Sequence, residues 1–141
     1  MPAAGLKISP KPNFSSVCNV VFDSAVPCIA VLWKCYVTSP QLREVHEHIL
    51  QLLRVHQVHF ILGDDTALPV ILAEDQRWIA QDWMPRAQAV GLKAIASKRS
   101  SSYFGQLSVQ CVQSIAPAGL AFRSFDKMED GRAWLRSVCP T

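Results

Sequence analysis

Charged residues are scarce in this chain and do not cluster. Only 18% of the residues are Asp, Glu, Lys or Arg, and the formal net charge is +3 at pH 7. The one dense basic stretch is Lys98–Arg99. A protein that binds DNA or RNA usually gathers Lys and Arg on one face, so the composition argues against a nucleic-acid partner.

Disulfide and membrane-spanning patterns are missing as well. The chain has five cysteines but no C-x-x-C pair, and most of them lie in apolar runs, as buried cysteines do in a reducing compartment. No apolar run is long enough to cross a bilayer. The proline-rich first residues do not resemble a signal peptide. We therefore expect a cytoplasmic protein without membrane insertion.

What is present is the composition of one folded domain. Half of the 141 residues are hydrophobic, which suffices for a single core. Residues 1–16 include Pro2, Pro10 and Pro12 and show no periodic pattern. We predict that residues 1–16 form a mobile N-terminal tail and that the domain spans residues 17–139.

Strand-like and helix-like segments alternate along this domain. Segments rich in β-branched and aromatic residues predict strands near residues 17–22, 28–37, 58–62, 92–97 and 120–125. Helical spacing predicts helices near residues 39–53, 74–91 with a bend at Pro85, 102–115 and 126–138. The order ββαβαβαβα predicts a single α/β domain with a mostly parallel mixed sheet, in which the first strand is antiparallel.

Two helices carry specific predictions about caps and buried faces. Ser39 is predicted to cap the first helix, with Pro40 in its first turn. The apolar stripe of that helix is Leu42, Val45, Ile49, Leu52 and Leu53. The third helix is predicted to turn Phe104, Leu107, Cys111 and Ile115 inward.

Several of these segments resemble one protein family. The run Trp33-Lys34-Cys35-Tyr36-Val37-Thr38-Ser39 is similar to the W-K-G-F-V-T-S junction between strand and helix in STAS/SpoIIAA-like proteins, which are common in the Bacteroidetes. The family's second helix and last helix are matched by Glu74 to Trp78 with Trp83, Pro85, Ala87 and Gly91 to Lys93, and by Phe125-Asp126 with Ala133-Trp134-Leu135. The similarity covers about residues 17 to 138.

This resemblance implies a STAS-like fold, SpoIIAA-like branch, in a bacterial regulatory domain that has no catalytic activity. Better-known relatives are regulators switched by phosphorylation of a Ser or Thr beside the second helix, and others resemble lipid-carrying domains. Thr66 is the one hydroxyl residue in the matching segment, Asp64 to Pro69. It is therefore the phosphorylation candidate, although it lies well before the predicted helix start at Glu74.

Asp64 and Asp65 follow a predicted parallel strand, and ligands of open α/β sheets bind at the carboxyl ends of strands. Paired carboxylates can act as acid and base or hold a divalent cation. The alternative is a solvated turn in which Asp64 accepts hydrogen bonds from backbone amides. We favour the turn, because no phosphate loop or second acidic pair accompanies the two residues.

The four histidines do not have metal-binding spacing. His46 and His48 are two residues apart, which points their rings to different faces of a helix, and residue 50 is Leu. No cysteine or serine has a recognisable catalytic context. We therefore predict no metal, no cofactor and no enzymatic activity.

Trp78, Trp83 and Met84 make the second helix rich in large apolar residues. The two tryptophans are five residues apart and cannot share one face of an α-helix. We expect one in the core and the other partly exposed beside Met84, as part of a partner or ligand surface.

Three functions follow in order of preference. The first is an interaction module that binds a protein partner, or itself as a dimer, through this helix and the Asp64–Thr66 loop. The second is a carrier or sensor of a small apolar or anionic ligand, bound between the sheet and the Trp78/Trp83 helix. The least favoured is a hydrolase that uses Asp64 and Asp65.

Overall fold

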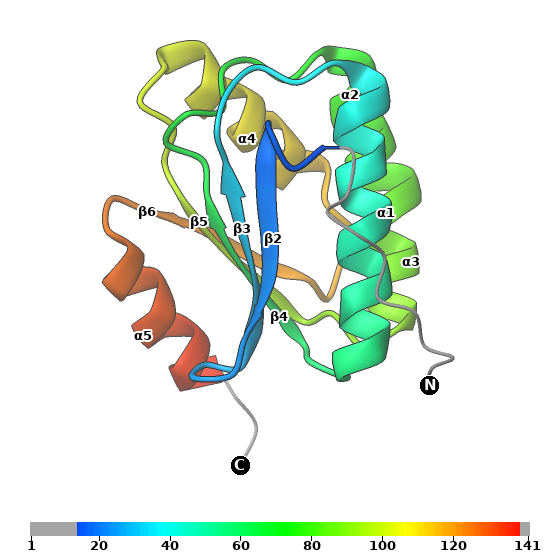
Figure 1. Ribbon diagram of the computed structural model, residues 1–141, viewed down its shortest axis with the longest axis vertical. Coiled ribbons are helices and arrows are strands. Elements are labelled where there is room, and N and C mark those ends of the chain that lie inside the picture. Colours follow the sequence, from blue (N-terminus) through cyan, green and yellow to red (C-terminus); the bar gives the residue numbers. More distant parts are fainter. Residues whose placement is uncertain (1–13, 139–141) are drawn as a thin grey trace.

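Five strands lie side by side in the computed structural model, which describes residues 14–138 (Figure 1). In sheet order, which is also chain order, they are β2 (Cys18–Asp23), β3 (Cys28–Trp33), β4 (Phe60–Asp64), β5 (Ala94–Lys98) and β6 (Ala121–Phe125). β2 is antiparallel to β3, and all other neighbours are parallel. The predicted mixed sheet with one antiparallel strand is confirmed.

Helices connect the parallel strands, and one more helix follows the last strand. They are α1 (Ser39–His56), the continuous segment α2 (Ala73–Trp78), η1 (Ile79–Trp83) and α3 (Met84–Ala89), then α4 (Tyr103–Ile115) and α5 (Met128–Val138). The predicted order ββαβαβαβα is confirmed, with the second helix built from three pieces. No helix in the described range is long and apolar enough to cross a membrane.

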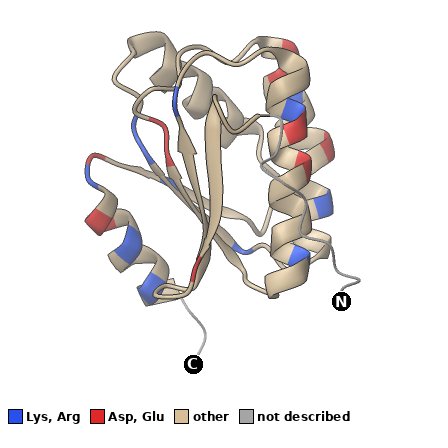
Figure 2. Cartoon of the chain, in the orientation of Figure 1, with Lys and Arg blue, Asp and Glu red and all other residues tan. Residues whose placement is uncertain are grey.

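The helices cover the two faces of the sheet unequally. α1, the α2–η1–α3 segment and α4 lie over one face, whereas α5 lies over the other (Figure 1). Side chains alternate along a strand, so Ile61 of β4 points into the larger core while Phe60 and Leu62 pack beneath Leu135 of α5. Charged residues mark the outer sides of the helices more than the strands (Figure 2).

The start of α1 is capped one residue earlier than the sequence predicts. Thr38 accepts a hydrogen bond from the Gln41 amide at 3.3 Å, and the Gln41 side chain accepts one from the Thr38 amide at 3.0 Å. This capping box satisfies two free amides. Ser39, predicted as the cap, instead donates to the buried carboxylate of Asp75, which ties α1 to α2.

A π-helical turn, η1, interrupts the second helix before Pro85. The amide of Met84 donates to the carbonyl of Ile79, five residues back. Pro85 has no amide, and its ring would clash with a carbonyl four residues earlier in a regular α-helix. The wider turn accommodates the proline, and it turns both Trp83 and Met84 into the core, each 1% exposed.

The buried face of α4 differs from the predicted one. The helix buries Gly105, Ser108, Val109 and Val112 and exposes the predicted inward stripe, with Phe104 at 65%, Leu107 at 37% and Ile115 at 40%, and with Cys111 also exposed. Gly105 lets the helix approach the preceding loop, since an added Cβ would lie 2.5 Å from the Pro69 carbonyl oxygen. Ser108 satisfies the Ile71 amide at 2.9 Å. These polar and small residues fix the rotation of α4.

The N-terminal edge of the domain includes Phe14. Its side chain is 3% exposed and packs edge-on against the His48 ring at 5.4 Å. The sequence prediction assigns Phe14 to the tail, residues 1–16, but here it belongs to the core. Residues 1–13 of the predicted tail, and residue 139, lie outside the described residues.

Candidate functional site

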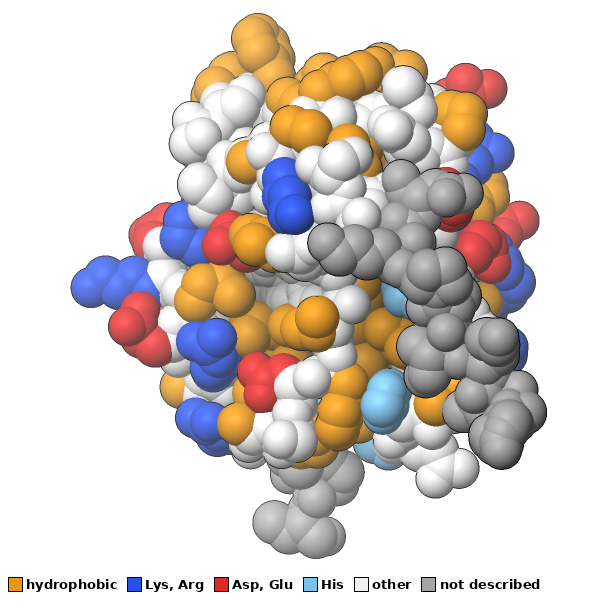
Figure 3. Space-filling model, in the orientation of Figure 1, with side chains coloured by type: hydrophobic (Ala, Val, Ile, Leu, Met, Phe, Trp, Pro, Cys, Tyr) orange, Lys and Arg blue, Asp and Glu red, His pale blue; other side chains and the backbone are white. Residues whose placement is uncertain are grey.

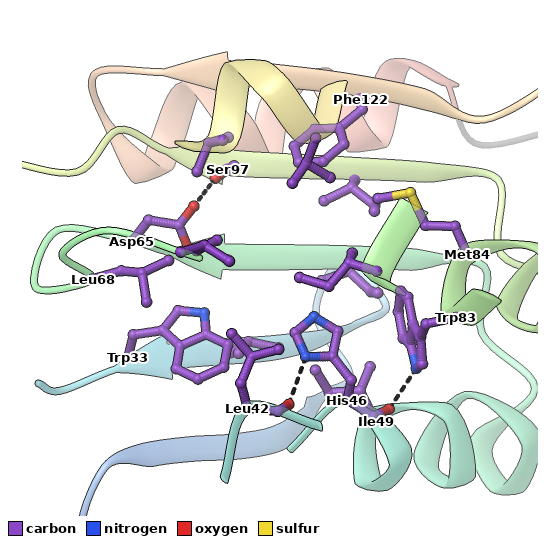
Figure 4. Close-up of a pocket in the computed structure, with 18 residues that line it drawn as sticks. Trp33, Leu42, His46, Ile49, Asp65, Leu68, Trp83, Met84, Ser97 and Phe122 are labelled. Atoms are coloured by element: carbon purple, nitrogen blue, oxygen red, sulfur yellow. Dashed lines mark hydrogen bonds between the residues drawn. The ribbon is translucent and has the colours of Figure 1, made fainter. Parts of the chain in front are cut away.

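A cavity of about 90 Å³ lies between the sheet and the helices of the larger core. Its walls come from strands β3 to β6 and from α1, η1, α3 and α4 (Figure 4). Most of the lining is aliphatic or aromatic: Val31, Trp33, Leu42, Ile49, Ile61, Leu68, Ile71, Ile79, Trp83, Met84, Ile95, Val109, Val112 and Phe122. Apolar walls with few polar groups are the usual character of a small-molecule site.

Asp65 is the one acidic residue in the cavity lining. Asp65 directly follows the last residue of β4 and is only 7% exposed. The Ser97 hydroxyl of β5 donates to Oδ2 of Asp65 (Figure 4), whereas Oδ1 takes no hydrogen bond from any described residue. Burial raises the pKa of Asp65 to about 6, against the opposing effect of the Ser97 hydrogen bond, and the charge of Asp64 raises it further.

His46 projects from α1 into the same cavity. Its Nδ1 lies 2.8 Å from the carbonyl oxygen of Leu42 (Figure 4). A carbonyl can only accept, so Nδ1 carries the proton. Burial lowers the pKa of His46 to about 4, so the ring is neutral near pH 7 and Nε2 has a free lone pair. Nε2 has no protein hydrogen-bond partner within residues 14–138.

Three tryptophans surround the His46 ring. Trp83 and Trp78 meet it edge-on, with centroids at 4.9 and 5.9 Å, and Trp33 lies at 6.0 Å. The Trp83 indole also donates to the backbone carbonyl of His46 at 2.7 Å. The π turn brings Trp78 and Trp83 to one histidine, which a regular α-helix does not allow for residues five apart.

Trp78 lies on the outer side of this aromatic cluster and does not line the cavity. The guanidinium groups of Arg43 and Arg86 lie 5.0 and 5.9 Å from its ring centre. Arg43 is paired with Asp75 at 3.3 Å, and Arg86 is paired with Glu47 at 2.6 Å. The partly exposed Trp78 is therefore covered by paired arginines.

A second, more polar hollow of about 200 Å³ adjoins the cavity. The two share Asp65, Val109 and Phe122 as lining residues. The remaining lining of the hollow is polar or charged: Arg99, Ser100, Gln106, Gln110, Gln113, Arg123 and Ser124. Asp65 thus stands where an apolar cavity meets a polar one.

Asp64 and Asp65 do not form a pair. Oδ1 of Asp64 accepts from the amide and the hydroxyl of Thr66, at 3.0 and 2.6 Å, and Lys98 Nζ donates to the same hydroxyl at 2.6 Å. Asp65 instead turns into the cavity toward Ser97. Asp64 therefore makes the turn that the sequence favours, and the Thr66 hydroxyl is already held between a carboxylate and an ammonium.

The six residues proposed from the sequence divide into two groups. Asp65, Trp83 and Met84 meet in the cavity, while Asp64, Thr66 and Trp78 lie outside its lining. Trp83 is the buried tryptophan and Trp78 the partly exposed one, as expected of the pair, but Met84 is buried and is not part of an exposed surface. The sequence reading missed His46, Trp33 and Ser97. His46 falls on the apolar side of α1, four residues after Leu42 and three before Ile49, which is the signal that could have found it.

The most exposed apolar surface lies elsewhere, at the start of α4 and the loops beside it. Hydrophobic side chains gather along the upper edge of the molecule (Figure 3). Tyr103 is 67% exposed and Phe104 65%. Tyr36, Val70 and Leu72, in the loops after β3 and β4, are also exposed.

Residues 14–138 bring no three His, Cys, Asp or Glu side chains together in a way that could hold a metal ion. Comparison with protein-family models, with curated proteins and with solved structures finds no match to this chain. The STAS-like resemblance therefore stays a prediction from the sequence motifs, with which the α/β topology is consistent.

Proposed function

We propose that this domain binds a small molecule in the cavity between its sheet and α1, η1–α3 and α4, as a carrier or sensor without catalytic activity. The observation that carries the proposal is the pair of free acceptor atoms, Asp65 Oδ1 and His46 Nε2, in an otherwise apolar cavity. No buried side-chain nitrogen or oxygen of the described residues lacks a hydrogen-bond partner, so these two free atoms are open to the cavity, where a bound molecule can satisfy them.

Size limits what the cavity accepts. A cavity of about 150 Å³ in another protein holds benzene. The cavity of about 90 Å³ in this domain accommodates a molecule smaller than benzene. Alternatively, it holds one part of a longer molecule that continues past Asp65 into the polar hollow. This fits a metabolite or fragment of a few non-hydrogen atoms better than a lipid chain.

Native mass spectrometry of freshly purified protein tests the proposal. Wild type should carry a reproducible adduct that the Gly63→Val variant lacks, because Gly63 lines the cavity and its added methyl groups would fill it. Ala121→Val is the matched control, since Ala121 is exposed on β6 and lines neither hollow. An adduct of equal occupancy in all three proteins would place the ligand elsewhere.

A second candidate is the regulatory, STAS-like interaction module expected from the sequence. It is favoured by one observation, the exposed apolar stripe of α4 with Phe104 and Leu107. Self-association through this stripe should appear as a dimer in the same native spectrum and should be lost in Phe104→Ser/Leu107→Ser. A monomer at all concentrations would remove the support for a self-associating module.

Hydrolase activity through Asp64 and Asp65 is not supported by the geometry, since the two carboxylates bind different partners. The proposal is therefore that the domain is not an enzyme. Replacing both residues with Asn and screening for hydrolysis tests this: any activity that wild type has and the double variant lacks would contradict it.

A further inference from the structure

The polar atoms that face the cavity restrict the chemistry of its ligand. Asp65 Oδ1 and His46 Nε2 are both acceptors, because Asp65 Oδ2 is already bound to the Ser97 hydroxyl and His46 Nδ1 to the Leu42 carbonyl. A ligand group that bonds to either atom must donate the hydrogen bond. A carboxylate has no proton to donate, and a carboxylate or phosphate would bring a second negative charge beside Asp65 in an apolar cavity, which is unfavourable without a compensating charge.

The charge around Asp65 favours a cation in that position. The structure pairs Asp65 with a hydroxyl and with no Lys or Arg. The nearest cationic side chain on β5, Lys98, donates to Thr66 instead. In the adjoining hollow, Arg99 is paired with Asp126 at 2.7 Å, and the Arg123 guanidinium lies over Phe125 and Trp134. A buried carboxylate without a cation is stabilised by one that the ligand brings.

The walls suit such a cation. Trp33, Trp83 and Phe122 line the cavity, and aromatic rings attract ammonium groups through their negative faces. Aliphatic side chains of β3, β4 and β5 complete the lining and exclude water from the other parts of a small ligand.

We infer that the ligand is a small primary amine: an ammonium group bound by Asp65 Oδ1, on a short branched aliphatic body held against Trp33, Trp83 and Ile61, with His46 Nε2 as a second acceptor in the cavity lining. This inference rests on the proposed small-molecule function and names the ligand class for the same cavity. It replaces the apolar or anionic ligand expected from the sequence with a cationic one.

The test compares three probes with the same aliphatic body: isobutylamine, isobutanol and isobutyrate. The readout is the ¹³C-methyl NMR signal of methionine. Among the three methionines, Met84 lines the cavity, whereas Met128 packs against the smaller core under α5 and serves as the internal control. The variants are Asp65→Asn, which keeps the shape and removes the charge, and Asp64→Asn as its matched control outside the cavity.

At pH 8 isobutylamine should shift the Met84 signal and bind about tenfold or more tightly than isobutanol, as a charge-assisted hydrogen bond requires. Isobutyrate should not bind. Asp65→Asn should abolish the preference for the amine, and Asp64→Asn should leave it unchanged. If isobutanol or isobutyrate binds as tightly as the amine, the amine inference is wrong and the cavity function stands. If none of the three shifts Met84, the proposed cavity function itself fails.

Discussion

The Trp83 indole donates a 2.7 Å hydrogen bond to the backbone carbonyl of His46, and the two rings meet edge-on at 4.9 Å. This contact joins the π turn of the second helix to the middle of α1. It holds in place the histidine whose Nε2 faces the cavity, so the local geometry around Pro85 and the binding atoms of the proposed site are directly connected.

Removing that hydrogen bond should loosen the site more than the fold. Trp83→Phe keeps an aromatic ring in the core but leaves the His46 carbonyl without the indole donor. We expect a loss of stability of about 1–3 kcal/mol and broadened NMR signals of His46 and Met84. Chemical denaturation and ¹³C-methyl spectra of Met84 would measure both. A variant as stable as wild type with unchanged Met84 signals would show that the contact does not order the cavity.

Two glycine substitutions should differ sharply. An added Cβ at Gly105 would lie 2.5 and 2.6 Å from the carbonyl oxygens of Pro69 and Leu68, whereas at Gly63 its nearest neighbour is Asp65 Oδ1 at 3.5 Å. Gly105→Ala should therefore destabilise the domain by about 1–3 kcal/mol through overpacking. Gly63→Ala should be neutral or slightly stabilising. Thermal denaturation of both variants is the measurement, and equal effects would contradict the close approach of α4 to the preceding loop.

Asp65 should make the domain less stable as the pH rises. Its pKa is raised from 3.8 to about 6 in the folded state, so the unfolded chain loses the proton first and stability falls between these pH values. Well above pH 6, this ionisation lowers the free energy of unfolding by about 3 kcal/mol. Asp65→Asn should be more stable than wild type by about that amount at pH 8 and equal to it near pH 3.5. Urea denaturation at a series of pH values measures the difference.

His46 should make the domain more stable as the pH rises, which is opposite to the effect of Asp65. Its pKa is lowered from 6.5 to about 4, so the unfolded chain binds the proton more readily and stability rises with pH between these values. In wild type the pH dependence of stability from Asp65 therefore opposes that from His46. Glu47 and His48 on α1, whose pKa values are also lowered, add smaller pH-dependent changes in stability. The groups facing Asp65 are Asp64, Cys18 and Ser97, with Lys98 held on Thr66. Asp65→Asn should therefore reveal a rise in stability from pH 4 to 6.5 that Asp65→Asn/His46→Gln lacks.

The exposed stripe of α4 should affect association and not folding. Phe104→Ser/Leu107→Ser changes side chains that are 65% and 37% exposed, so stability should change by about 0.5 kcal/mol or less for each. If the stripe is an interface, the double variant should sediment as a smaller species than wild type. Val55→Ser on α1, where Val55 is 58% exposed, is the control and should behave as wild type.

The sequence predicts the sheet, its one antiparallel strand and the order of helices, because alternating and helical apolar periods are local properties of the chain. It does not predict the rotation of α4. Phe104, Leu107, Cys111 and Ile115 have helical spacing, but the close approach at Gly105 and the hydrogen bond of Ser108 to Ile71 depend on a loop more than thirty residues away in the chain.

The site is predicted only in part for a similar reason. Asp65, Trp83 and Met84 are candidates from their place after a strand and in an apolar helix, but the sequence does not tell which tryptophan is buried, and it places Met84 beside the exposed one. The π turn rotates them inward, and no local pattern marked it apart from Pro85. His46 lacks metal-binding spacing, and its place on the buried side of α1 is visible only from the apolar residues Leu42 and Ile49 that flank it.

Binding of an amine in the cavity is tested by ¹³C-methyl NMR titration of wild type with isobutylamine at pH 8, with Met84 as the reporter and Met128 as the control. We expect a saturable shift of the Met84 signal, no shift of Met128, and loss of the Met84 response in Gly63→Val. If isobutylamine, isobutanol and isobutyrate all leave Met84 unmoved, or if Met128 moves equally, the cavity is not the binding site and the proposed function is wrong.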